Sequence, residues 1–111
     1  MTHVIPVGTS EPQDFALRDD GAAIDGTGLD VELEIYTRVD GEMVQLDDDD
    51  DPPVAEWLDQ VAGTVRVTGC ESLEIDNYFV RYKLTDGAGN IGFCPNGAKA
   101  DLWKVVAIPA L

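Results

Sequence analysis

Residues 78–105 constrain the fold of this chain more than any other segment. Their first eight residues, YFVRYKLT, alternate between two sets of side chains: Tyr78, Val80, Tyr82 and Leu84 in one, and Phe79, Arg81, Lys83 and Thr85 in the other. A period of two is typical of a β-strand with two different faces. Two glycines within residues 86–90 predict a tight turn, and Ile91 and Phe93 predict a return strand. This order predicts a central strand near the end of a small β-sandwich.

A second hairpin is predicted from residues 31–46. The sequence VELEIY at its start alternates apolar residues with charged or aromatic ones. Asp40 and Gly41 then supply a two-residue turn of the kind that needs positive φ, and MVQL returns as the partner strand.

Shorter strands are predicted elsewhere. The sequence FALR at 15–18 alternates before a turn at Asp20 and Gly21, and residues 25–28 are expected to form a loop. Near the C-terminus, residues 102–108 predict a closing strand.

The segment VAEWLDQVAG at 54–63 fits two structures, because its apolar spacing suits a short strand through Trp57 or a one-turn helix. The strand is favoured because the following residues 64–68 alternate well, with Val65 and Val67 directed inward. About seven short strands separated by turns predict an all-β fold, an immunoglobulin-like antiparallel β-sandwich forming a single domain over residues 1–111.

The charge of the chain excludes some partners. There are 22 acidic and 7 basic residues, which gives a net charge of −15. Such a charge repels phosphate backbones and anionic membrane surfaces, so neither nucleic acid nor membrane insertion is expected. The apolar fraction of 44% is ordinary for a globular protein. The first ten residues lack the basic start and apolar run of a secretory signal, which favours the cytoplasm as the place of synthesis.

The metal-binding residue types are sparse. Cys70 and Cys94 are the two cysteines and His3 is the one histidine in the sequence. Because zinc sites need closely spaced cysteines and histidines, neither a metal nor another cofactor is expected. Two structural thiols are favoured over a disulfide, since the cytoplasm keeps thiols reduced.

The order of short motifs resembles a known family. A first element contains Leu17, Asp20 and Gly21, and a late element contains Tyr78, Val80, Thr85, Asp86 and Gly89, followed by Phe93 and Pro95. This order resembles the immunoglobulin-like N-terminal domain of phage baseplate upper proteins and related siphophage tail components. The family's second element is D-L-T-G; residues 25–28 of this chain read DGTG, so Gly26 stands where a leucine is usual, and Cys94 interrupts a phenylalanine-proline pair.

The resemblance implies a non-enzymatic structural protein of a phage tail or baseplate. Such a protein resides in a virion assembled in the host cytoplasm, and it packs against copies of itself, as a homo-oligomer, or against other tail proteins. The main alternative is a binding module of the same fold that recognises a host glycan or protein through its loops. A third interpretation, a hydrolase that pairs Asp86 with Asp76 or Glu74, is disfavoured because acidic residues beside turns usually serve solubility and backbone hydrogen bonding.

Candidate interface residues lie in two places. Phe79, Arg81 and Lys83 share the face of their strand opposite to Tyr78, where they can contact a neighbouring subunit. The run of aspartates at 47–51, including Asp48, Asp49 and Asp50, is interpreted as a solvated acidic loop that faces a basic patch on a partner. A calcium loop is disfavoured because Pro52 stands where an EF-hand needs glycine.

The aromatic side chains have two interpretations. They are expected to fill the core, although aromatic rings can also form a stacking platform for sugars. The residues concerned are Trp57, Trp103, Tyr78, Tyr82, Phe79 and Phe93.

Overall fold

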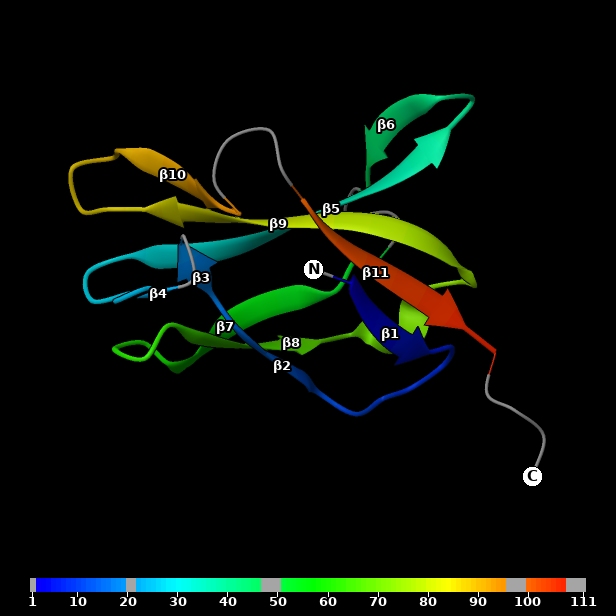
Figure 1. Ribbon diagram of the computed structural model, residues 1–111, viewed down its shortest axis with the longest axis horizontal. Coiled ribbons are helices and arrows are strands. Elements are labelled where there is room, and N and C mark those ends of the chain that lie inside the picture. The colour runs from blue at the N-terminus through cyan, green and yellow to red at the C-terminus, as the bar shows by residue number, and fades with distance from the viewer. Residues whose placement is uncertain (1, 20–21, 47–50, 96–99, 108–111) are drawn as a thin grey trace.

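The computed structural model describes residues 2–19, 22–46, 51–95 and 100–107, which form two facing β-sheets (Figure 1). The larger sheet contains, in spatial order, β1 (Thr2–Pro6), β11 (Asp101–Val106), β9 (Asp76–Thr85), β5 (Asp30–Val39) and β6 (Glu42–Gln45). A further strand, β10 (Ile91–Cys94), pairs with the second half of β9. The smaller sheet contains β2 (Gln13–Ala16), β8 (Thr64–Thr68) and β7 (Val54–Asp59), in that order.

Three short elements complete the described structure. The strands β3 (Arg18–Asp19) and β4 (Ala22–Ala23) pair with each other as a separate ribbon. A 3-10 turn, η2 (Cys70–Ser72), connects the two sheets and buries Cys70. The all-β sandwich predicted from the sequence is confirmed.

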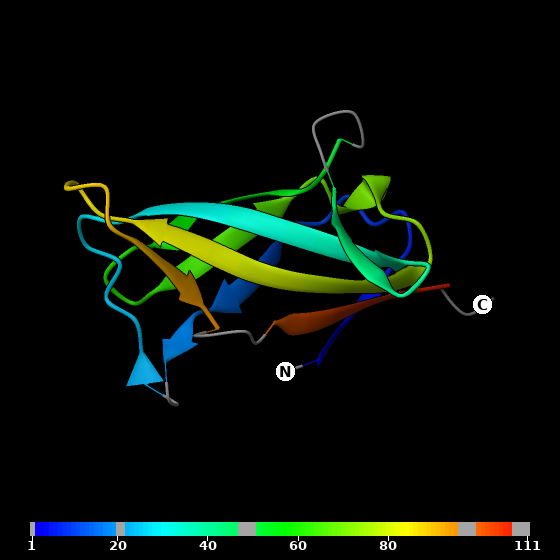
Figure 2. The ribbon, with the colours of Figure 1, turned by 90° about the horizontal axis from the view of Figure 1, so that it is seen from above.

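Strand β9 lies in the middle of the larger sheet, as its alternating pattern predicts. It runs antiparallel to β5 from the pair Asp30 and Thr85 to the pair Thr37 and Tyr78. Figure 2 shows these two strands as long neighbours that twist together across the molecule. The other edge of β9 is shared, since β11 pairs with its first half and β10 with its second half.

The core lies between the sheets and contains the inward side chains of β9, β8 and β11. The residues in its interior include Val65, Val67, Val80, Tyr82, Trp103 and Val105, all at most 2% exposed. The indole of Trp103 stacks on Phe15 of β2, with ring centroids 5.3 Å apart. This aromatic contact joins the larger sheet to the edge strand of the smaller one.

The β5–β6 hairpin forms as the sequence predicts. Asp40 and Gly41 have φ of 52° and 83°, the two positive values that a type I′ turn requires. The predicted strand through Trp57 is also confirmed as β7, so the one-turn helix is wrong at this position.

Three features of the sheets differ from the expected antiparallel sandwich of about seven strands. Strand β1 was not predicted, and it pairs with β11 in parallel. The ribbon of β3 and β4 adds two strands of two residues each. The closing strand begins at Asp101 and ends at Val106. Parallel neighbours need a long connection, and the chain between Pro6 and Asp101 supplies it, because β1 and β11 come from opposite ends of the sequence.

Candidate protein interface

The outer face of the larger sheet holds the candidate interface residues of β9. Tyr78, Val80, Tyr82 and Leu84 are buried against the smaller sheet, so the intervening Phe79, Arg81 and Lys83 point away from it. These three side chains are partly exposed. The structure therefore brings them together on one surface, here called the outer face.

Arg81 is the centre of a bonded cluster on the outer face. Its Nε donates to Glu34 Oε1 at 2.7 Å, and its Nη2 donates to the Tyr36 hydroxyl at 3.3 Å. That hydroxyl in turn donates to Glu34 Oε1 at 2.9 Å. The guanidinium also lies over the ring of Phe93, 3.9 Å from its centroid. Strands β5, β9 and β10 are thus joined across this face.

The cluster favours the ionised form of Glu34. Partial burial opposes ionisation, but the hydrogen bonds from Arg81 and Tyr36 and the charges of Arg81 and Lys83 hold the pKa of Glu34 below its usual value of 4.5. The hydrogen bond to Glu34 likewise raises the pKa of Arg81.

This shift predicts a pH-dependent contribution to stability. Because the pKa of Glu34 is lower in the folded state than in the unfolded state, the stabilisation is complete above pH 4.5 and is lost as the pH falls through the folded value. Glu34→Gln is expected to lower the free energy of unfolding by on the order of 1 kcal/mol at pH 7 and by much less at pH 3. Urea unfolding at both pH values measures this.

The matched control is Glu32→Gln on the same strand. Glu32 Oε2 lies 3.9 Å from Lys83 Nζ and its side chain is 70% exposed, so this change should have little effect at either pH. An equal loss from Glu34→Gln at pH 7 and pH 3 would show that the carboxylate charge is not the source.

The outer face has aromatic and basic residues in unusual number for so acidic a chain. Arg38 lies over the ring of Phe79, 5.3 Å from its centroid. Lys104 is exposed between the buried Trp103 and Val105, so it points to the same face. Four of the seven basic residues of the chain lie here, namely Arg38, Arg81, Lys83 and Lys104. Arginine, tyrosine and phenylalanine are the residue types enriched at protein–protein interfaces.

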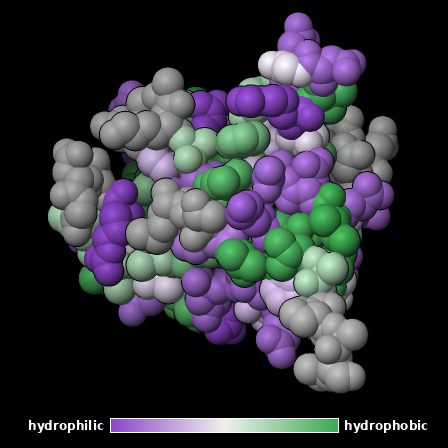
Figure 3. All heavy atoms as spheres, turned by 45° about the vertical axis from the view of Figure 1, so that its right-hand side comes forward, coloured by the Kyte–Doolittle hydropathy of each residue, from purple (hydrophilic) through white to green (hydrophobic). Residues whose placement is uncertain are grey.

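An apolar area continues the outer face at the end formed by β1 and β11. Val4 and Val106 are exposed there, and Pro6 pairs with Val106. Ile75 lies at the same end because the next residue, Asp76, pairs with Val105. Figure 3 brings this side of the molecule forward and shows apolar side chains grouped among polar ones.

The aspartates of the second candidate interface, Asp48, Asp49 and Asp50, lie outside the described residues, as does the predicted turn at Asp20 and Gly21. Within the described part of the chain, no group of three or more His, Cys, Asp or Glu side chains is arranged to hold a metal ion. The described residues also include no helix that is long and apolar enough to cross a membrane.

The carboxylates considered for hydrolysis lie at opposite ends of β9. Asp76 is the first residue of this strand and Asp86 follows its last residue, which separates them by roughly 30 Å. The Asp86 carboxylate accepts hydrogen bonds from the Asn90 side chain and from the backbone N–H groups of Asn90 and Ala88, and these bonds lower its pKa. Asp86 therefore organises a turn, and the proposed pairing with Asp76 or Glu74 does not form.

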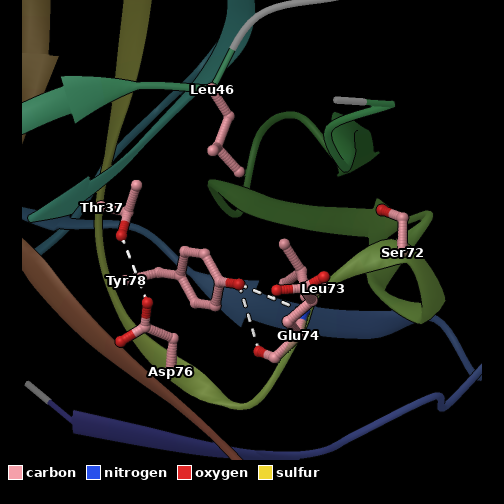
Figure 4. A pocket seen from close by; sticks show the side chains of 7 residues that line it. All are labelled: Thr37, Leu46, Ser72, Leu73, Glu74, Asp76 and Tyr78. Carbon is pink, nitrogen blue, oxygen red and sulfur yellow. Dashed lines mark hydrogen bonds between the residues drawn. The ribbon is translucent and has the colours of Figure 1, made fainter. Parts of the chain in front are cut away.

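A polar hollow of about 280 Å³ lies at the start of β9 (Figure 4). The Tyr78 hydroxyl donates to the Glu74 carbonyl and accepts from the Glu74 N–H, both at 3.1 Å. Burial raises the pKa of this phenol. Across the hollow, Thr37 Oγ1 lies 3.4 Å from Asp76 Oδ2. These contacts anchor the chain where it enters β9.

The aromatic residues mostly serve the core, as expected. Trp103, Tyr82 and Tyr78 are buried, which leaves them unable to stack on a sugar. Phe79 and Phe93 are partly exposed on the outer face beneath arginines. Trp57 is also partly exposed, and its Nε1 donates to the Leu29 carbonyl at 2.9 Å.

The cysteines are not joined in a disulfide, and both are buried. The Cys94 thiol lies 3.3 Å from the Arg18 carbonyl oxygen, to which it donates. Burial raises the pKa of Cys70 to about 11, so its thiolate is scarce at neutral pH. The expectation of two structural thiols agrees with this arrangement.

No protein-family model matches this chain, and no curated protein matches it.

Proposed function

We propose that this chain is a non-catalytic structural domain of a phage tail or baseplate, which acts by packing against copies of itself and against other tail proteins. The observation that carries the proposal is the outer face, where Phe79 and Arg81 lie among most of the basic residues of a chain with net charge −15. Because Glu34 and Glu32 lie beside Arg81 and Lys83, the outer face is closer to neutral than the rest of the chain, and it can contact another copy with less charge repulsion. The motif order that resembles baseplate upper proteins supports the virion setting.

We also infer that the sandwich is immunoglobulin-like. The smaller sheet order β2-β8-β7 corresponds to strands B, E and D of that fold. The order β11-β9-β5-β6 corresponds to strands G, F, C and C′ of a variable-type domain. Tyr78 bonds back to Glu74 near the start of β9, as the tyrosine of strand F does in such domains. The chain lacks their inter-sheet disulfide, since Cys70 and Cys94 remain thiols.

Self-association is tested with Phe79→Asp. We expect the native chain to form a defined oligomer by size-exclusion chromatography with light scattering, and Phe79→Asp to be monomeric, because a carboxylate at the centre of the outer face must be desolvated on association. The variant should fold normally, since Phe79 points away from the core.

The matched control is Val61→Asp, which places the same charge at a side chain 69% exposed, in the turn between β7 and β8. This variant should keep the native oligomer. The test concentration is about 100 µM, on the order of the dissociation constants of weak specific complexes. A native chain that stays monomeric at this concentration and binds a host glycan would instead favour the loop-based binding module. Neighbouring genes for tail-fibre or tape-measure proteins are expected, and a setting among metabolic genes would contradict the phage assignment.

A further inference from the structure

The strand β2 forms one edge of the smaller sheet (Figure 1). Its register with β8 pairs Phe15 with Val65 and Ala16 with Thr64. The Leu17 N–H donates to the Gly63 carbonyl at 2.8 Å, so the odd-numbered residues of this strand bond to β8. The main-chain N–H and C=O groups of Asp14 and Ala16 therefore point away from β8. Among the described residues, neither makes a further backbone hydrogen bond.

A groove of about 450 Å³ runs along this edge. It is lined on the β2 side by residues 14–18 and on the other side by parts of β1, β10 and β11 of the larger sheet. The floor consists of Leu17, Tyr82 and Cys94, all nearly fully buried. At the rim, the imidazole of His3 meets the Phe15 ring edge-on, with centroids 4.6 Å apart. The groove thus combines an apolar floor with an unpaired strand edge.

This combination matches an extended peptide. Two outward residues present two N–H donors and two C=O acceptors, spaced roughly 7 Å apart along the strand, as an added strand requires. Every second side chain of such a peptide would point down onto the apolar floor. A bound strand would therefore extend the smaller sheet from three strands to four.

Charge indicates the composition of the bound segment. Asp14 and Asp101 line the groove together with Arg18, and the Asp14 carboxylate accepts two hydrogen bonds from Arg66, at 2.8 and 3.1 Å. The charges around the groove nearly balance. The net charge of −15 on the whole chain therefore sets the preference, and it attracts segments with basic side chains. We propose that the groove beside β2 binds an extended segment of a partner protein, with alternating apolar and basic side chains, as an added β-strand. This site is separate from the outer face and does not depend on the phage assignment.

A synthetic peptide of nine alternating lysine and valine residues tests the proposal. Calorimetric titration should give at least about tenfold tighter binding than the same peptide with all its backbone amides N-methylated, because methylation removes the strand hydrogen bonds and keeps the charge. Ala16→Pro should abolish this difference, since proline deletes the outward N–H and leaves the bonds to β8 intact.

The matched control is Gln45→Pro. Leu46 donates to the Ile35 carbonyl, so Gln45 is likewise an outward residue of an edge strand, on β6 and away from the groove. This variant should bind the peptide as the native chain does. Equal affinity of the native chain for both peptides would show that charge attraction alone causes binding, and it would overturn the proposal. Unchanged peptide binding by Ala16→Pro would overturn it for the same reason. Self-association that Ala16→Pro abolishes would overturn it too, because a second copy would then occupy the groove.

Hydrogen exchange of the native chain gives a readout that does not need a variant. With saturating peptide, the amide hydrogen of Ala16 should exchange at least about tenfold more slowly, because this N–H then donates a hydrogen bond to the added strand. Unchanged exchange at Ala16, with binding still observed, would locate the peptide elsewhere.

Discussion

Gly63→Ala is expected to destabilise the protein by more than about 3 kcal/mol, a large part of the stability of a domain of this size. Gly63 has φ of 71°, which disfavours any residue with a Cβ. A Cβ added there would also overlap the Ile24 carbonyl oxygen. Because Gly63 accepts the Leu17 N–H bond that aligns β2 with β8, the backbone has little freedom to move away.

The comparison that isolates this overlap is Gly89→Ala. Gly89 has a similar φ of 86°, but an added Cβ meets nothing within 4 Å. Gly89→Ala should therefore lower the free energy of unfolding by only about 1 kcal/mol, the cost of placing a residue with a Cβ at positive φ. Urea unfolding of both variants measures the difference. An equal decrease in the free energy of unfolding in the two variants would mean that Gly63 and Ile24 are not in such close contact.

Trp103→Ala is expected to cost about 3–5 kcal/mol and to lower Tm by more than about 10 °C. The indole is fully buried and stacks on Phe15, so its removal leaves a cavity between the two sheets. Thermal unfolding followed by circular dichroism measures the shift. A change of less than about 1 kcal/mol would contradict the central position of Trp103 in the core.

Trp103→Phe is the informative companion variant. Among the described residues, no hydrogen-bond partner lies near Trp103 Nε1, although this atom is buried. The substitution by phenylalanine removes part of the buried ring system, and it also removes the unpaired N–H, whose burial is unfavourable. We therefore expect Trp103→Phe to lower the free energy of unfolding by much less than Trp103→Ala does. A loss as large as that of alanine would show that the full indole shape is required.

The two proposed binding surfaces use different parts of the sandwich. The outer face offers side chains of β5, β9 and β10, with Arg81 held in place by Glu34 and Tyr36. The groove beside β2 offers main-chain groups and a buried floor. Phe79→Asp and Ala16→Pro should therefore affect self-association and peptide binding independently of each other.

Local patterns in the sequence predicted most of the strands. The period of two in residues 78–85 identified β9 and the side chains that share each of its faces, because successive residues of a strand point to opposite sides. Asp40 and Gly41 identified the β5–β6 turn through their tolerance of positive φ. Phe79, Arg81 and Lys83 were placed on one face by the same local rule.

Pairings between distant residues were decided by the tertiary structure. The parallel contact of β1 with β11, the bond from Arg81 to Glu34 and the open edge of β2 each join segments far apart in the chain. Their registers depend on which apolar faces pack together, and no short motif records that choice. The sequence by itself thus determined most of the strands, with their faces and turns, but not β1 or the short ribbon of β3 and β4. The packing of two sheets around Trp103 decided which strands became neighbours, and with them the outer face and the groove, because only packing brings such distant side chains together.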